Sequence, residues 1–80
     1  MGLVRELISA ESGDGKQHKD LHRCTYEIFN TAEGTRLFQL NSYGTEDRKH
    51  PEKVSQTLQF NEESAKELIN ALRRAFPALS

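Results

Sequence analysis

The sequence has no tryptophan, only one cysteine, and a hydrophobic fraction of 35% over 80 residues. The single cysteine, Cys24, excludes an internal disulfide and favours a reducing compartment. No apolar run is long enough to cross a membrane, so we expect no membrane partner. Charged Arg5 and Glu6 come too early for a signal peptide. These absences together predict a cytoplasmic location.

The chain also lacks an excess of charge of either sign, because 11 Lys and Arg residues nearly balance 12 Asp and Glu residues. The formal net charge is −1 and the pI is about 6.3, which argues against a general polyanion binder but leaves room for a local basic surface. Eighty residues make a single domain, over residues 1–80, at a size where one core is marginally stable. One helix over one sheet leaves a sheet face open, so we expect a homodimer. The alternative is a marginal monomer with an open face.

The clearest local pattern is an alternating strand that runs directly into a helix. Along Val54–Phe60, apolar residues alternate with polar ones, with Gln56 as the exception. Asn61 is a good N-cap, and apolar residues then recur at helical spacing as far as Phe76. Pro77 stops the helix. We therefore expect an amphipathic helix over residues 61–76, which the homodimer would use as its interface.

A hairpin precedes this unit. Residues 23–31 and 36–43 have strand character, and Gly34 occupies the third position of a three-residue loop, where the chain turns left-handed. This closure pairs Ile28 with Phe38 and Arg23 with Tyr43. One face of the hairpin is then apolar and includes Cys24, which we expect to be buried. A two-residue loop would scatter the apolar residues over both faces, so we reject it.

The remaining segments complete the expected fold. Leu3–Ser9 suits either a helical turn or a short strand, and we predict a strand. Residues 11–20 and 44–53 are loops, the second long and charged. The expected class is α+β, with a four-stranded antiparallel sheet followed by one C-terminal amphipathic helix (ββββα).

Residues that would support catalysis are missing. No serine or cysteine has the setting of a nucleophile, and a mid-strand thiol such as Cys24 usually behaves as a small hydrophobe. His18, His22 and Cys24 do not follow the usual spacing of zinc ligands. We expect neither an enzyme nor a bound metal or cofactor.

The polar face of the predicted sheet carries the most informative side chains. Aromatic side chains stack on unpaired bases, and cations at the rim hold phosphates. The candidate residues are Phe29 and Tyr43 for stacking, Arg23, Lys49 and Lys53 for phosphates, and Gln39, Asn41 and Thr57 for hydrogen bonds. On residue types alone, the simpler interpretation is an ordinary solvated sheet face.

Arg36–Leu72 resembles the DNA-binding region of the transcriptional coactivator PC4 family and its bacterial relatives. The shared order is a strand ending in an aromatic (Leu37–Tyr43), a charged loop with Pro51 and Lys53, and a strand, cap and helix. Two positions depart from the family pattern, because Gly44 follows Tyr43 and Glu52 precedes Lys53.

The resemblance covers just under half of the chain. It implies four antiparallel strands, one helix, a homodimer and binding of single-stranded DNA or RNA with little sequence preference, as in a transcription or DNA-maintenance accessory factor. The alternative is a small dimeric protein-interaction module that binds no nucleic acid. A small-molecule site between two subunits is the third and weakest hypothesis.

Overall fold

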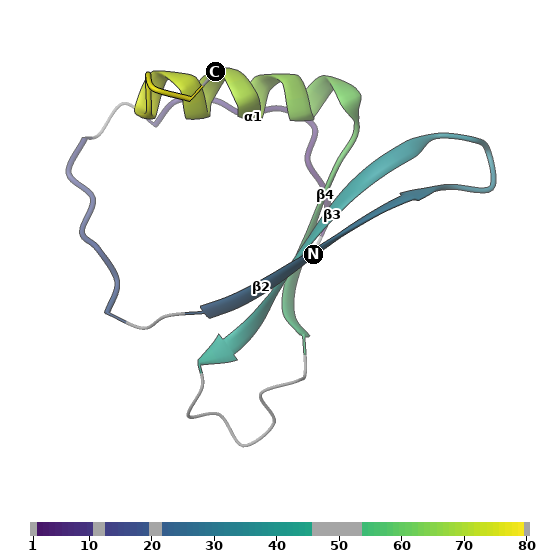
Figure 1. Cartoon of the computed structure of the whole chain (residues 1–80), viewed down its shortest axis with the longest axis horizontal. Coiled ribbons are helices and arrows are strands. Elements are labelled where there is room, and N and C mark those ends of the chain that lie inside the picture. The colour runs from purple at the N-terminus through teal and green to yellow at the C-terminus, as the bar shows by residue number, and fades with distance from the viewer. Residues whose placement is uncertain (1, 11–12, 20–21, 46–53, 80) are drawn as a thin grey trace.

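The computed structural model describes residues 2–10, 13–19, 22–45 and 54–79. It has an α+β fold, in which a four-stranded mixed sheet is followed by one C-terminal helix (Figure 1). The elements are β1 (Gly2–Leu3), β2 (His22–Asn30), β3 (Arg36–Thr45), β4 (Val54–Phe60) and α1 (Glu62–Ala75). The strand order is β1-β4-β3-β2, so β3 and β4 are the inner strands.

The β2–β3 hairpin has the register that the sequence predicts. Ile28 lies opposite Phe38, and the loop closes with a 2.8 Å hydrogen bond from the Thr31 N–H to the Thr35 carbonyl. Gly34 has a φ of 86°, the left-handed conformation that the three-residue loop requires. The turn and the apolar alternation therefore select the same pairing.

The open end of the hairpin, far from the Gly34 loop, is less regular. The register shifts between His22 and Cys24 on β2, and again between Ser42 and Tyr43 where β3 meets β4. The predicted pairing of Arg23 with Tyr43 therefore does not occur. Such bulges add local twist and change the direction in which neighbouring side chains point.

The N-terminal strand differs most from expectation. Instead of Leu3–Ser9, the strand is only Gly2–Leu3, and it runs parallel to β4, with Gly2 opposite Leu58. The prediction of a wholly antiparallel sheet is wrong at this pair. After Val4, whose N–H donates to the Gln59 carbonyl at 2.7 Å, the chain leaves the sheet edge and passes beside α1. This departure ends the strand early.

Helix α1 begins and ends as the sequence predicts. The Asn61 Oδ1 accepts from the Ser64 N–H at 2.9 Å, and the Asn61 N–H donates to the Ser64 Oγ at 3.1 Å. This reciprocal capping box fixes the first turn, and Ser64 is fully buried there. The last helical residue is Ala75, followed by the cap Phe76 and then Pro77.

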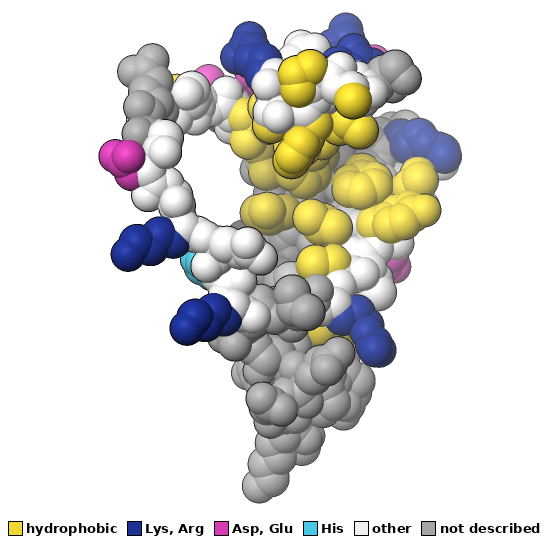
Figure 2. All heavy atoms as spheres, turned by 60° about the vertical axis from the view of Figure 1, so that its left-hand side comes forward, with side chains coloured by type: hydrophobic (Ala, Val, Ile, Leu, Met, Phe, Trp, Pro, Cys, Tyr) yellow, Lys and Arg dark blue, Asp and Glu magenta, His cyan; other side chains and the backbone are white. Residues whose placement is uncertain are grey.

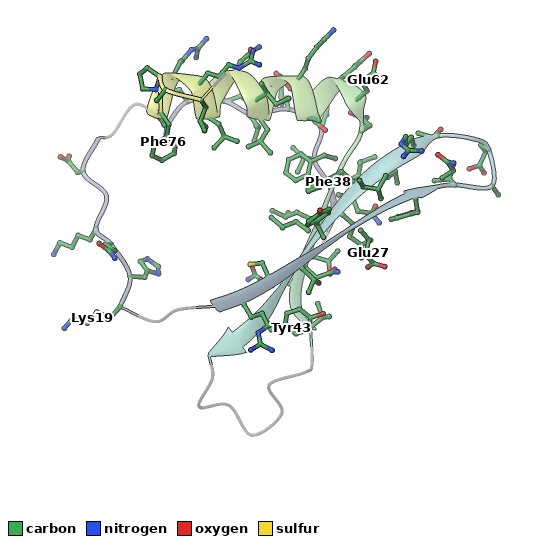
Figure 3. The ribbon with its side chains drawn as sticks, viewed as in Figure 1. Lys19, Glu27, Phe38, Tyr43, Glu62 and Phe76 are labelled. Atoms are coloured by element: carbon green, nitrogen blue, oxygen red, sulfur yellow. The ribbon has the colours of Figure 1, made fainter. Side chains whose placement is uncertain are left out.

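The apolar side of the sheet faces the helix but is only partly covered. An aromatic row crosses three strands, with ring centroids 5.5 Å apart for Tyr26 and Phe38 and 6.3 Å apart for Phe38 and Phe60. Phe38 lies on the side of the sheet that faces α1 (Figure 3). Among the described residues, only Leu37 and Phe60 are buried hydrophobics, while Tyr26 is 65% exposed. One chain therefore builds a very small core.

Cys24 illustrates this incomplete coverage. Its side chain is exposed, so the predicted burial is wrong for the single chain. Its register partner is Ser42, well along the strands from Phe38, which pairs with Phe60 just before the helix. Helix α1 covers that junction and leaves Cys24 open.

The hairpin geometry gives a first prediction. Replacing Gly34 with valine should lower the free energy of unfolding by about 1–2 kcal/mol, because a β-branched residue is strained at positive φ. No atom lies within 4 Å of a Cβ built at Gly34, so the cost comes from the backbone alone. Urea unfolding measures it.

The matched control is Gly15→Val, at a loop glycine without a positive φ and with equally open surroundings. Its effect should be within a few tenths of a kcal/mol. A Gly34→Val loss as small as that of the control would show that the loop tolerates side chains and does not set the register.

Candidate nucleic-acid interface

The sheet surface opposite α1 is called the polar face here. Glu27 and Tyr43 lie on this side of the ribbon, away from Phe38 and the helix (Figure 3). Strand alternation and hydrogen bonds assign to it Thr25, Glu27 and Phe29 of β2, Leu37, Gln39, Asn41 and Tyr43 of β3, and Thr57 and Gln59 of β4. Three strands thus contribute to one surface.

Asn41 lies at the centre of the polar face and is 5% exposed. Its Nδ2 donates to the Thr25 Oγ1 at 3.3 Å and to the Glu27 Oε2 at 3.1 Å. Its Oδ1 accepts from the Gln39 Nε2 at 2.9 Å and from the Thr57 Oγ1 at 3.2 Å. Both N–H groups and both acceptor positions of the amide are therefore used within the sheet.

The network continues through the two glutamines. The Gln39 Nε2 also donates to the Glu27 Oε2 at 3.2 Å, and the Gln39 Oε1 accepts from the Gln59 Nε2 at 2.8 Å. A chain of side-chain hydrogen bonds therefore runs from β4 across β3 to β2. Such a network orients the Gln39 and Asn41 side chains, because each of these two amides is bonded to more than one neighbour.

The aromatic candidates are less exposed than the sequence suggests. Tyr43 is half-buried, and its hydroxyl and the Thr25 hydroxyl share a 3.3 Å hydrogen bond. Phe29 is also half-buried and lies opposite the buried Leu37 in the hairpin. The Tyr43 ring is therefore linked to β2 through its hydroxyl, whereas Phe29 belongs to a small apolar corner at the other end of the face.

The structure brings together Gln39, Asn41, Tyr43 and Thr57 of the predicted site, through direct or shared hydrogen-bond partners. Arg23 is exposed near the irregular end of β2. Lys49 and Lys53 lie outside the described residues. The placement of the predicted phosphate contacts thus depends on Arg23 alone within the described chain.

Glu27 was not among the predicted site residues, although its carboxylate accepts two hydrogen bonds at the β2 end of the network. The register already places Glu27 opposite Gln39 on the polar face, so its location was readable from the sequence. Its hydrogen bonds to Gln39 and Asn41 could not be read from the sequence, because they depend on how far each side chain reaches across the strands.

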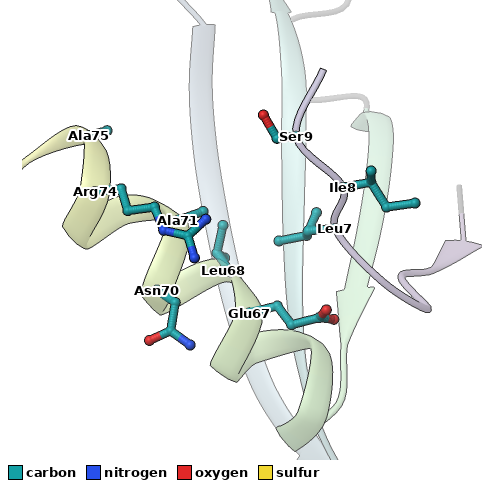
Figure 4. A pocket seen from close by; sticks show the side chains of 9 residues that line it. All are labelled: Leu7, Ile8, Ser9, Glu67, Leu68, Asn70, Ala71, Arg74 and Ala75. Atoms are coloured by element: carbon teal, nitrogen blue, oxygen red, sulfur yellow. The ribbon is translucent and has the colours of Figure 1, made fainter. Parts of the chain in front are cut away.

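Two hollows in the described surface lie on the helix side. One, of about 830 Å³, lies between residues 7–9 and α1 and includes Leu7, Leu68 and Arg74 in its lining (Figure 4). A second, of about 220 Å³, lies beside Phe38 and Phe60. Within the described residues, no three His, Cys, Asp or Glu side chains gather as metal ligands, and no helix has the length and apolar character to cross a membrane.

Searches against family models, curated proteins and solved structures found no match to this chain. Any function must therefore be argued from the geometry of the chain itself.

The network generates a stability prediction. Asn41→Ala should lower the free energy of unfolding by about 1–3 kcal/mol, because it removes four hydrogen bonds and leaves partly buried partners such as Thr57 without them. Urea unfolding at a fixed protein concentration tests it. The control is Asn30→Ala at the exposed end of β2, which should cost less than about 0.5 kcal/mol. Equal losses in both variants would contradict a structural role for Asn41.

Proposed function

We propose that this chain is a single-stranded nucleic-acid-binding protein that acts without catalysis. More particularly, we propose a cytoplasmic homodimer of the PC4-like kind, serving as a transcription or DNA-maintenance accessory factor. The observation that carries the proposal is the polar face, on which a tyrosine ring and a row of hydrogen-bonded amides lie on β3 and β4. Bases need flat partners for stacking, and unpaired bases alone present their faces.

Tyr43 is the best-supported stacking residue. Its hydroxyl is held by Thr25, and Thr25 is held in turn by Asn41, so the ring has little rotational freedom to lose on binding. A side chain that is already ordered costs less entropy when it binds a ligand. Asn41 positions the Thr25 hydroxyl and is not expected to contact the ligand, since every donor and acceptor position of its amide is already hydrogen-bonded.

The phosphate contacts would come from Arg23 and the two loop lysines, Lys49 and Lys53. With a net charge of −1 on the whole chain, few phosphates can be neutralised per subunit. We therefore expect modest affinity and a shallow salt dependence. A dimer would help, because two faces on one strand bind with a higher effective concentration.

The homodimer is supported by the open apolar side of the chain. The accessible surface is 7374 Å², about half as much again as the roughly 4,900 Å² of a compact monomer of this mass. The radius of gyration, 14.8 Å, exceeds the value of about 12 Å for a compact domain of this length. Extended segments such as residues 13–19 contribute part of this excess, and each partner in a stable complex buries only about 800 Å².

Many of the exposed apolar side chains gather on one side of the molecule. Figure 2 shows them gathered between α1 and the sheet, and Figures 1 and 2 show residues 13–19 standing apart from both. The exposed members are Tyr26, Ile28, Val54 and Leu58 on the sheet, and Ile69, Leu72, Phe76 and Leu79 in or after the helix. A second copy offers a surface of the same apolar character, and its helix would cover both sets at once.

The exposed apolar side chains of α1 provide the test of the dimer. Leu72→Asp should raise the dimer dissociation constant by about a hundredfold or more, because it would bury an unpaired charge in the interface. Light scattering over a dilution series measures the association. Asn70→Asp is the control, since it adds the same charge at an exposed position two residues away that does not share the side of Leu72. A folded wild-type monomer of 9.1 kDa across the micromolar range would reject the dimer.

The stacking role of Tyr43 provides the functional test. Tyr43→Ala should weaken binding of a labelled single-stranded oligonucleotide by roughly 1–3 kcal/mol, the usual scale for a lost base–aromatic contact. Tyr43→Phe keeps the ring and loses only the hydroxyl, so it should retain most of the affinity. Fluorescence anisotropy with DNA and RNA strands, and with a duplex for comparison, gives the values.

The competing hypothesis, a dimeric protein-interaction module, predicts a different result. The negative charge of Glu27 on the polar face and the small net charge favour it. In that case no oligonucleotide binds at moderate salt, and both Tyr43 variants behave like the wild type. Absence of an anisotropy change at tens of micromolar protein would end the nucleic-acid proposal.

A further inference from the structure

The hydrogen bonds within the polar face occupy most of its central donors and acceptors and leave few of them for a ligand. The donors of Asn41 and Gln39 are all used, each amide giving both N–H groups to neighbours. The Asn41 oxygen is also filled, by Gln39 and Thr57. The central amides therefore cannot donate to an incoming base without breaking a bond within the sheet.

The Glu27 carboxylate, on the edge strand β2, differs from these amides. Its Oε2 accepts two hydrogen bonds, from the Gln39 and Asn41 amides, which hold the group in place. Its Oε1 accepts no hydrogen bond from any residue in the described part of the chain, and the side chain is exposed. A carboxylate oxygen is an acceptor only, so this position offers an oriented acceptor with negative charge.

Such a group discriminates among ligand atoms. It repels phosphates, which must then follow the rim near Arg23, and it favours groups that carry N–H donors. Carboxylates in nucleic-acid complexes accept from the N4 amino group of cytosine. Uracil and thymine carry a carbonyl oxygen at the corresponding position, so a carboxylate there faces another acceptor, which is unfavourable.

We infer that Glu27 is a base-selecting residue, which makes the polar face prefer bases bearing an exocyclic amino group over uracil and thymine. The inference rests on the proposed function and refines the low sequence preference stated above. The Glu27 Oε1 accepts one amino hydrogen of the base, while the Gln39 and Asn41 amides keep the carboxylate oriented through Oε2. No covalent bond is made or broken.

The test compares oligo-dC with oligo-dU of equal length, at one salt concentration and a slightly alkaline pH where oligo-dC stays single-stranded. The two share sugar, backbone and ring size, and their bases differ at the exocyclic group and at N3, which is an acceptor in cytosine and carries a hydrogen in uracil. The wild type should bind oligo-dC about five- to tenfold more tightly, at the low end of what a base contact contributes. Glu27→Gln should bring this ratio close to one, because its amide can also donate to the uracil carbonyl.

Glu33→Gln is the matched control. It removes the same charge from the exposed hairpin loop, outside the network, and should leave the ratio unchanged. A wild type that binds both oligonucleotides equally overturns the inference but leaves the proposed function in place. An unchanged ratio in Glu27→Gln also overturns it. Binding to neither oligonucleotide overturns the proposed function and the inference with it.

A second measurement needs no variant and covers the case in which Glu27→Gln does not fold. N4,N4-dimethylcytosine has no amino hydrogens, so an oligonucleotide made from it should lose the advantage of oligo-dC and bind the wild type about as weakly as oligo-dU. Retention of the full oligo-dC affinity would overturn the inference.

Discussion

The period-two alternation along β3 is the constraint on which both surfaces of the sheet depend. β3 pairs with β2 on one side and β4 on the other, so its side chains stand at the middle of each face. Phe38 and Leu40 point to the helix side, and Gln39 and Asn41 to the opposite side. A slip of one residue would exchange these sets and leave amides against the helix. The closure at Gly34 prevents that slip.

The apolar surface extends beyond what one chain can cover. Helix α1 follows β4 directly after a one-residue cap, so it can reach Phe60 and Phe38 but not the far end of β2, where Cys24 is exposed. A chain with 35% hydrophobic residues and no tryptophan has little other apolar surface from which to build a core. Association with a second copy would cover this apolar surface, so the proposed dimer would stabilise the fold as well as serve the proposed function.

The polar surface is organised by a different principle. Its central amides, Gln39 and Asn41, are bonded to their neighbours, and a carboxylate on the edge strand β2 accepts from both of them. That arrangement suits a ligand that contributes flat rings and N–H groups, and it disfavours one that contributes only phosphates. The two proposals about this face, stacking on Tyr43 and selection by Glu27, follow from the same bonds and act at different atoms.

The sequence alone determined the hairpin register, the Asn61 cap, the end of the helix before Pro77 and the assignment of side chains to faces. All of these depend on neighbours within a few residues or on simple alternation. The tertiary structure decided the parallel pairing of Gly2–Leu3, the bulges near Arg23 and Tyr43, the exposure of Cys24 and the bonding of Asn41 and Glu27. These depend on where distant segments meet and how far each side chain reaches, which alternation does not specify.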